Sequence, residues 1–156
     1  MSQKRKILFV CTGNSCRSVM AEGLLRHIME QRGRKDVQVM SAGTGAMPGM
    51  GPTLETVQAM WEMGVDVSTH LSQSLAPDLI RHADGIFCME DFHLEQVLDI
   101  DPEANSKAFM LRTFENPDPR VEQNIPDPIG QPLKVYQACA SVIQETVKRV
   151  ADWIER

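Results

Sequence analysis

The chain has 156 residues, enough for one well-buried core and too few for two ordinary domains, so we expect a single domain spanning residues 1–156. Hydrophobic residues make up 42% and charged residues 24%, which is ordinary for a globular protein. A net charge of −5 argues against a nucleic-acid partner, and no apolar run is long enough to cross a membrane. The basic start MSQKRK leads into an apolar run too short for a secretory signal. We therefore expect a cytoplasmic protein whose four cysteines are thiols or catalytic groups.

Strands and helices alternate along the predicted chain, because apolar runs of strand length are separated by segments with helical spacing. The longest pattern, Leu133–Ile154, has an apolar residue every three or four positions and predicts the final helix. In chain order the predicted elements are a strand at 6–10, a helix at 18–31, a strand at 37–42, a helix from Thr53 to Gly64, a short helix at 77–83, a strand at 86–89, a helix near 91–99, a strand at 107–111 and the helix at 133–154.

Two loops interrupt this alternation. The segment GTGAMPGMGP, residues 43–52, and the stretch 112–132 with its five prolines have no apolar period. Alternating strands and helices indicate an α/β domain with a parallel sheet of four strands and helices on both faces. In such sheets ligands bind at the carboxyl ends of the strands, so we expect functional residues there and in the longer loop.

The turn CTGNSCRS, residues 11–18, lies between the first strand and the first helix, where this architecture places chemistry. The amino end of a helix offers unpaired N–H groups and the positive end of the helix dipole. Gly13 can take a positive φ and Asn14 tolerates the left-handed region, so the N–H groups can curl inward. Arg17 adds a planar fork for two oxygens of an anion. The turn lacks the Gly-Lys-Ser/Thr ending of an ATP-binding loop, so it is not a loop of that kind. It predicts instead a cradle for a phosphate-sized anion.

Cys11 is the candidate nucleophile at the floor of this cradle. The helix dipole, Arg17 and the N–H groups together favour its thiolate, and the Ser18 hydroxyl can donate a further hydrogen bond. Attack on phosphorus also needs a proton donor for the leaving group, and Asp127, held between two prolines in NIPDPIG, is the candidate. A buried structural thiol is the simpler alternative for Cys11, and a metal site with Cys16 lacks the usual ligand spacing. We expect no metal and no cofactor.

These residues resemble those of the low-molecular-weight protein tyrosine phosphatases, and the likeness covers nearly the whole chain. The matching segments, in order, are VCTGNSCRSVMAEG, SAGT, GVDVSTHLSQSL, IFCME and DPIG. The resemblance implies a flavodoxin-like three-layer fold with a four-stranded parallel sheet, and phosphorylated proteins as substrates. It also implies that Cys11 attacks phosphorus to form a cysteinyl-phosphate, while Asp127 protonates the leaving group and then activates water. Arg17 and the N–H groups of the loop would stabilise the transition state.

The resemblance also assigns roles to the remaining residues of the site. Four residues would form a polar network that holds the loop, namely Asn14, Ser18, Ser41 and His70. The family usually has arginine where Gln73 stands. Cys16 would protect the nucleophile through a reversible disulfide with Cys11, with a space-filling thiol as the alternative. The loop residues that would surround the phosphate are Thr12, Gly13, Asn14, Ser15, Cys16 and Ser18.

The substrate side chain stays open between phosphotyrosine and phosphoarginine. Tyrosine-specific members have aromatic residues after SAGT and after the Asp-Pro, whereas this chain has Ala46, Met47, Met50 and Ile129 there. Protein-arginine phosphatases of the family have threonine at the position of Ser15, where tyrosine-acting members tend to have an apolar residue. A small hydroxyl at this position can contact a guanidinium and orient water, so the sequence favours both substrates about equally.

Two other functions remain as alternatives. CTGNSCRS also resembles the loop of thiol-dependent arsenate reductases, which share this fold and relay electrons through two further cysteines. Cys88 stands near the first of these, but EDFHLEQVLDID contains no second one, and we interpret Cys88 and Cys139 as core residues. A non-catalytic phosphate-binding or adaptor domain would be expected to lack Cys11, Arg17 or Asp127, and all three are present.

Overall fold

The computed structural model describes residues 5–156, so the first part of the basic start, on which the expectation about a secretory signal rests, lies outside the described residues. Strands and helices alternate as predicted. In chain order they are β1 (Lys6–Cys11), α1 (Arg17–Gln31), β2 (Gln38–Gly43), α2 (Leu54–Glu62), α3 (Pro77–His82), β3 (Gly85–Cys88), α4 (Asp91–Ile100), the 3₁₀ helix η1 (Pro102–Ser106), β4 (Ala108–Met110) and α5 (Leu133–Ile154).

The 3₁₀ helix η1 is the element that the sequence analysis missed. Pro102 occupies its first turn, and the carboxylate of Asp101 caps it by accepting a hydrogen bond from the N–H of Glu103 at 3.0 Å. One such turn is too short to produce an apolar period, which is why no helical pattern indicated it. The other elements begin and end within two residues of their predicted bounds.

All four strands lie parallel in one sheet, in the order β2-β1-β3-β4. β1 is therefore a central strand, paired with β2 along its whole length and with β3 from Ile7 to Val10. The carboxyl ends of these strands meet at one edge of the sheet, where Cys11 lies beside Gly43. The predicted four-stranded parallel sheet is confirmed. Its central strand ends at the residue that the sequence marks as the nucleophile.

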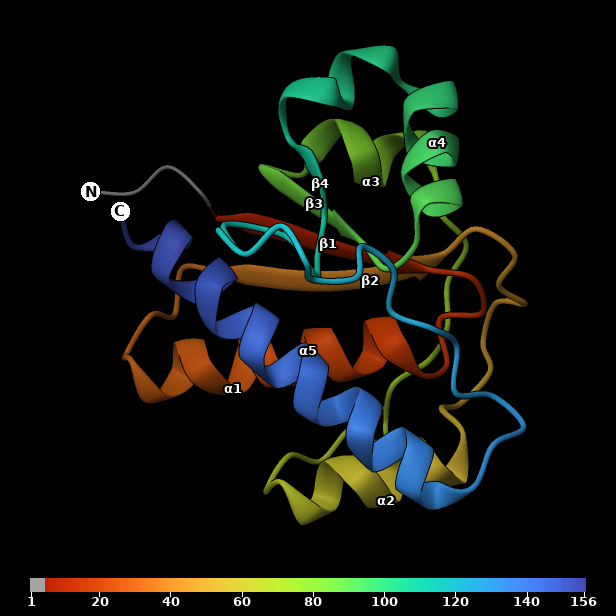
Figure 1. The fold of residues 1–156 in the computed structure, drawn as a ribbon. Coiled ribbons are helices and arrows are strands. Elements are labelled where there is room, and N and C mark those ends of the chain that lie inside the picture. Colours follow the sequence, from red (N-terminus) through yellow and green to blue (C-terminus); the bar gives the residue numbers. More distant parts are fainter. Residues whose placement is uncertain (1–4) are drawn as a thin grey trace.

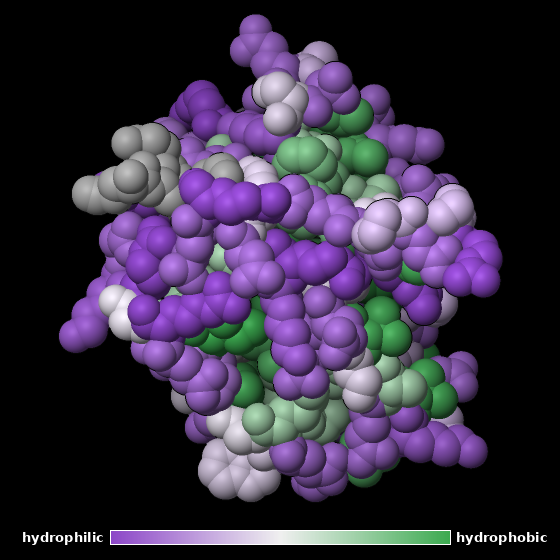
Figure 2. Space-filling view, turned by 60° about the vertical axis from the view of Figure 1, so that its left-hand side comes forward, coloured by the Kyte–Doolittle hydropathy of each residue, from purple (hydrophilic) through white to green (hydrophobic). Residues whose placement is uncertain are grey.

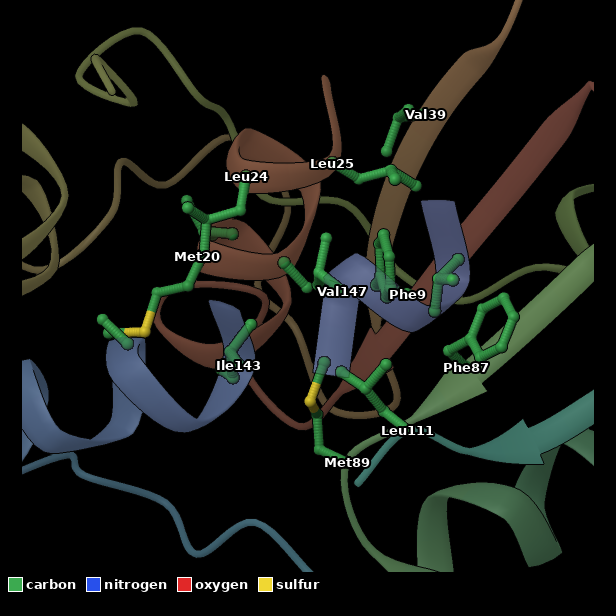
Figure 3. Close-up of a cluster of buried hydrophobic side chains, with 14 of the residues drawn as sticks. Phe9, Met20, Leu24, Leu25, Val39, Phe87, Met89, Leu111, Ile143 and Val147 are labelled. Atoms are coloured by element: carbon green, nitrogen blue, oxygen red, sulfur yellow. The ribbon is translucent and has the colours of Figure 1, made fainter. Parts of the chain in front are cut away.

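Helices cover both faces of the sheet, as Figure 1 shows. Successive residues of β1 point to opposite faces, so Phe9 packs in the core beneath α1 and α5 while Leu8 packs in the core beneath α3 and α4. α2 lies against α1 and α5 and buries Ala59 and Met60. Figure 3 shows the larger core, in which side chains of the sheet meet those of α1 and α5, among them Phe9, Met20, Leu24, Phe87, Ile143 and Val147.

The surface is mixed in character. On the face shown in Figure 2, hydrophilic residues predominate and hydrophobic ones lie between them in separate areas. Among the helices that the structure describes, none combines the length and the apolar character needed to cross a membrane.

Candidate active site

The phosphate loop, residues 11–18, runs from the end of β1 into the first turn of α1. Its sharp turn is made by Asn14, whose φ of 53° lies in the left-handed region. The positive φ expected at Gly13 is not found, so the prediction was right about Asn14 and wrong about Gly13. As a result the N–H of Asn14 donates a hydrogen bond to Sγ of Cys11 at 3.3 Å. The loop thus curls over the sulfur.

Cys11 lies at the bottom of the loop with 2% of its surface exposed. Its Sγ is 2.9 Å from Oγ of Ser18, in the first turn of α1. Oγ of Ser18 also accepts a hydrogen bond from Nδ2 of Asn14 at 2.8 Å, which leaves the hydroxyl proton of Ser18 for the sulfur. Two donors from the loop and the helix therefore converge on Cys11, an arrangement that favours negative charge on the sulfur.

The side-chain amide of Asn14 is the centre of the polar network. Asn14 is fully buried, and its Nδ2 donates to Oγ of Ser18 and to Oγ of Ser41, both at 2.8 Å. Its Oδ1 accepts from the backbone N–H of Gln73 at 2.9 Å and from Nε2 of His70 at 3.3 Å. All the hydrogen-bonding positions of the amide are thus occupied, and the structure brings together the four residues of the expected network.

Glu22 and Gln73 extend this network beyond the expected residues. Oγ of Ser41 donates to Oε1 of Glu22 at 2.6 Å, and Nδ1 of His70 lies 4.0 Å from the same oxygen. Nε2 of Gln73 donates to the backbone carbonyl of Ser41 at 2.9 Å. Glutamine therefore supplies a backbone and a side-chain donor at the position where the resemblance led us to expect arginine. Glu22 was missed, because a lone carboxylate on a helix reads as a surface residue.

The last residue of β2, Gly43, lets the phosphate loop approach the sheet closely. A Cβ atom on Gly43 would lie 2.3 Å from the backbone oxygen of Thr12, a distance that no side chain permits. Beyond it, the N–H of Thr44 donates to the carbonyl of Cys11 and the N–H of Gly45 to the carbonyl of Thr12, each at 2.9 Å. The segment after β2 is therefore bonded directly to the start of the loop.

Arg17 holds the other side of the site with a buried guanidinium, 2% exposed. Its Nη1 donates to Oε2 of Glu90 at 2.8 Å and to the carbonyl of Ile125 at 2.7 Å, while its Nη2 lies 3.5 Å from Oδ2 of Asp127. A buried arginine needs such partners, since an unpaired charge in the interior is costly. Glu90, in the first of these contacts, was not assigned a role in the sequence analysis, although it belongs to the matching segment IFCME.

The long proline-rich loop carries Asp127 to this point. The N–H of Ile125 donates to the carbonyl of Met89 at 2.9 Å, and Oδ1 of Asn124 accepts from the N–H of Asp91 at 2.8 Å. These bonds fasten the loop to the segment that follows β3. The carboxylate of Asp127 is partly exposed and also accepts a hydrogen bond from the N–H of Ile129 at 3.1 Å. The structure therefore brings Asp127 beside Arg17, as expected.

His93, in the first turn of α4, is a second residue that the sequence analysis missed. It is fully buried; its Nδ1 accepts the N–H of Glu90 at 3.0 Å, so its Nε2 carries the proton and donates to Oγ1 of Thr12 at 2.8 Å. Burial, together with the positive charge of Arg17, lowers the pKa of His93 to about 4. The neutral imidazole of His93 thus links Thr12, which follows Cys11, to Glu90, which pairs with Arg17. The spacing Glu90-x-x-His93 at a helix start was the signal that could have indicated it.

Comparison with known proteins places the chain in a family. The family model for low molecular weight phosphotyrosine protein phosphatases matches residues 6–156. The chain belongs to this family.

Some similar proteins are named protein-arginine-phosphatases and others protein-tyrosine-phosphatases. A protein-arginine-phosphatase of Geobacillus stearothermophilus is 33% identical over 150 residues, 96% of each chain. The low molecular weight protein-tyrosine-phosphatase Wzb of Escherichia coli strain K12 is 30% identical over 145 residues, 93% of this chain and 92% of Wzb. A solved structure of the YwlE arginine phosphatase, a cysteine-to-serine variant with a phosphorylated active-site serine, matches with a TM-score of 0.88 at 29% identity and covers 97% of this chain and 96% of that one.

Ser15 and Cys16 are neighbours in the phosphate loop, just before α1. The backbone carbonyl of Ser15 accepts the N–H of Thr53 at 3.2 Å, which ties the loop to the start of α2. Sγ of Cys16 lies 3.5 Å from Oγ1 of Thr53 and 3.7 Å from Oγ of Ser15. Cys16 is buried and Ser15 is half-buried. Both predicted loop residues are therefore in the site, and Cys16 shares the loop with Cys11.

Cys88 and Cys139 do not belong to the phosphate loop. Cys88 is fully buried on β3, and burial raises the pKa of its thiol to about 12. Cys139, half-buried on α5, has its pKa raised to about 12 by the same cause. Thiols with such pKa values are protonated near neutral pH and are poor partners for thiol–disulfide exchange. The chemistry of Cys88 thus disfavours the electron relay of an arsenate reductase.

The depressed pKa of His93 makes the stability of the protein depend on pH. The unfolded chain takes up a proton on this histidine near pH 6.5, whereas the folded protein does so only near pH 4, so the free energy of unfolding falls as the pH drops between these values. At about pH 5 the loss attributable to His93 is about 2 kcal/mol relative to about pH 8. Between the same two pH values, we expect the free energy of unfolding of His93→Gln to fall by about 2 kcal/mol less than that of the wild type. Urea unfolding at both pH values measures the difference.

All other titratable groups are the same in wild type and variant, so the difference between the two isolates the histidine. His82→Gln, at the exposed end of α3, is the matched control and should follow the wild type. If the free energy of unfolding changed with pH equally in the wild type and in His93→Gln, the fold would not be keeping His93 neutral.

Proposed function

We propose that this chain is a cysteine-dependent protein phosphatase, a phosphoric monoester hydrolase acting on phosphorylated side chains of proteins. The observation that carries the proposal is that Cys11 and Arg17 share the phosphate loop and Asp127 reaches Arg17 from the proline-rich loop. The sulfur is 2.9 Å from a serine hydroxyl, and the guanidinium is 3.5 Å from the aspartate. A nucleophile, an anion-binding fork and a carboxyl group are what phosphoryl transfer through a covalent intermediate requires. Membership of the phosphatase family supports it.

In the first step, Sγ of Cys11 attacks phosphorus, and a sulfur–phosphorus bond forms as the bond to the leaving group breaks. The leaving atom takes a proton from Asp127, which must carry one at this stage. Arg17 faces the oxygens of the transferring group, together with the N–H groups of the loop, and balances the charge that they carry. The hydrogen bond from Ser18 supports the thiolate before attack.

In the second step, water attacks the cysteinyl-phosphate. Asp127, now ionised, accepts a proton from this water, and the sulfur–phosphorus bond breaks to release phosphate and restore the thiolate of Cys11. Glu90 keeps Arg17 oriented through both steps, since it holds Nη1 at 2.8 Å. No step calls for a cofactor or a metal.

Two substitutions test this mechanism. Cys11→Ser should abolish turnover and still bind inorganic phosphate, because the loop and Arg17 remain. Asp127→Ala should lower kcat by roughly 10²–10⁴ for substrates with poor leaving groups and spare those with good ones. Steady-state kinetics on phosphopeptides and aryl phosphates, with calorimetry for phosphate binding, measures both effects.

Asp118→Ala is the matched control for the second substitution, since Asp118 lies in the same loop but pairs with Arg120 at the surface. It should behave like the wild type. Substantial turnover by Cys11→Ser, or equal losses for good and poor leaving groups in Asp127→Ala, would contradict the covalent mechanism.

For the substrate side chain we propose phosphotyrosine or phosphoarginine, and Ser15 is the observation that favours the second. Its half-buried hydroxyl belongs to the phosphate loop, and a hydroxyl in this place can contact a guanidinium. The rim also lacks aromatic walls, because Met47, Met50 and Ile129 stand exposed where tyrosine-specific members have aromatic residues. Relatives with similar identity to this chain include a protein-arginine-phosphatase and a protein-tyrosine-phosphatase, which supports keeping both.

Ser15→Ile distinguishes the two substrates. If Ser15 contacts the guanidinium, the variant should lose about tenfold in kcat/KM on phosphoarginine peptides and little on phosphotyrosine peptides of the same sequence. Ser15→Thr keeps the hydroxyl and should retain the preference of the wild type. Strong preference of the wild type for phosphotyrosine, unchanged in Ser15→Ile, would rule out phosphoarginine.

We further propose that Cys16 protects the nucleophile in a reducing compartment such as the cytoplasm. Peroxide would oxidise the thiolate of Cys11 to a sulfenic acid, and the thiol of Cys16 would condense with it to a disulfide and release water. Support comes from the presence of both thiols, free and buried, in the phosphate loop. A cellular thiol would then reduce the disulfide and restore activity.

Brief peroxide treatment tests this role. The wild type should lose activity and recover it fully with dithiothreitol, whereas Cys16→Ser should recover poorly because its nucleophile proceeds to irreversible acids. Mass spectrometry of the treated protein follows the loss of the two thiol hydrogens. Cys139→Ser, which removes a thiol outside the loop, is the control and should recover like the wild type, while equal recovery in Cys16→Ser would contradict protection.

A further inference from the structure

Two loops beside the phosphate loop hold large apolar side chains in water. Met47 is 71% exposed and Met50 53% exposed in the segment after β2, and Leu71 is 65% exposed in the segment before α3. We call these three residues the apolar crest. A single exposed apolar side chain is ordinary, but several held together next to a site indicate a binding surface.

The segment that holds Met47 and Met50, residues 43–53, is hydrogen-bonded to the phosphate loop at both of its ends. After β2, the N–H groups of Thr44 and Gly45 donate to the carbonyls of Cys11 and Thr12. Before α2, the N–H of Thr53 donates to the carbonyl of Ser15 at 3.2 Å. Figure 1 shows this segment beyond the end of β2, on the side where the chain passes from β1 into α1. The crest therefore stands at a constant position relative to the nucleophile.

Ser72 joins the two segments of the crest. It is buried, and its Oγ donates to the carbonyl of Met47 at 2.5 Å and accepts the N–H of Met50 at 2.9 Å. Its backbone N–H donates to the carbonyl of Met50 at 2.8 Å, and its carbonyl accepts the N–H of Gly49 at 2.9 Å. These four hydrogen bonds join the segment 47–50 to Ser72, the neighbour of Leu71. A glycine- and proline-rich segment that could be flexible is thus ordered, with its apolar side chains turned outward.

The crest is also free of charge. Residues 43–54 and 67–77 contain no aspartate, glutamate, lysine or arginine, in a chain that is 24% charged. The histidine among them, His70, directs its Nε2 to the oxygens of Asn14, within 3.3 Å. A charged partner segment could form no ion pair with these loops. An apolar segment could bind them by burying apolar surface away from water.

We propose that the apolar crest binds large aliphatic side chains next to the phosphorylated residue of a polypeptide substrate. This inference rests on the proposed phosphatase function, because the crest is continuous with the phosphate site and whatever places a phosphorylated side chain over Cys11 brings its neighbours to the crest. Methionines are adaptable enough to accept different aliphatic side chains. Ordering of the loop in advance lowers the entropy that binding costs. The preferred substrates are then phosphorylated segments with leucine, isoleucine or methionine close by and few charges.

The test compares two phosphopeptides that differ only in having leucine or serine on both sides of the phosphorylated residue, with para-nitrophenyl phosphate as a substrate that has no flanks. The wild type should prefer the leucine peptide through a lower KM. The double variant Met47→Ser/Leu71→Ser should lose about tenfold in kcat/KM on the leucine peptide. Its loss on the serine peptide and on para-nitrophenyl phosphate should be much smaller, because neither substrate has aliphatic flanks for the crest to bind.

Trp61→Ser is the matched control, since Trp61 is 66% exposed near the end of α2 and belongs to neither segment of the crest. It should match the wild type on all three substrates. Equal KM values of the wild type for the two peptides would overturn the proposal, and so would an equal loss on all three substrates in the double variant. A dimer in sedimentation that the double variant converts to a monomer would instead assign the crest to a second copy of the chain.

Binding of the same peptides to Cys11→Ser, measured by calorimetry, separates this proposal from the proposed function. If the wild type hydrolyses neither peptide nor para-nitrophenyl phosphate, the phosphatase function fails. The crest still stands if the leucine peptide then binds more tightly than the serine peptide and loses that advantage in the Met47→Ser/Leu71→Ser background. It fails if both peptides bind alike.

Discussion

The site depends on one buried side-chain amide. Asn14 adopts a left-handed turn whose φ of 53° sends its N–H to the sulfur of Cys11, and that turn is held because the amide makes hydrogen bonds to α1, β2 and the segment before α3. With all its donors and acceptors occupied, the amide has one orientation. Loss of any partner would leave a buried polar group unpaired, at a cost of about 1–3 kcal/mol, and would loosen the loop around the nucleophile.

Charge in the site is arranged around a single cation. Arg17 is buried between Glu90 and Asp127, and the nearby His93 is kept neutral by burial and by Arg17 itself. Glu90 is hydrogen-bonded tightly and fixes the guanidinium, whereas Asp127 lies farther off on a partly exposed loop. This difference suits their proposed roles, since a positioning carboxylate should stay in place and a proton donor must reach the leaving group.

The surroundings of this centre depart from those that the resemblance to tyrosine-specific members implies. Where tyrosine-specific members have aromatic residues, this chain has methionines on a segment that Ser72 holds in order. Gln73, next in the chain, supplies two donors to the network of Asn14 and Ser41 where arginine is usual. The same short segment therefore supports the phosphate loop through Gln73 and orders the exposed segment 47–50 through Ser72.

The sequence by itself determined the parallel sheet and the order of the elements other than η1, since apolar period and turn residues act over a few positions. It also predicted that Cys11, Asn14, Arg17 and Ser18 lie together, because one strand end and one helix start contain them all. Asp127 was a candidate proton donor from its place between two prolines in the long loop, and the resemblance assigned it the same role.

Only the tertiary structure decided the contacts that hold these residues in place. Glu90 is 73 positions from Arg17, and His93 is 81 positions from Thr12. No local pattern relates residues so far apart. They meet because β1 and β3 are parallel neighbours, which brings the carboxyl ends of both strands, and the segments that leave them, to the same edge of the sheet.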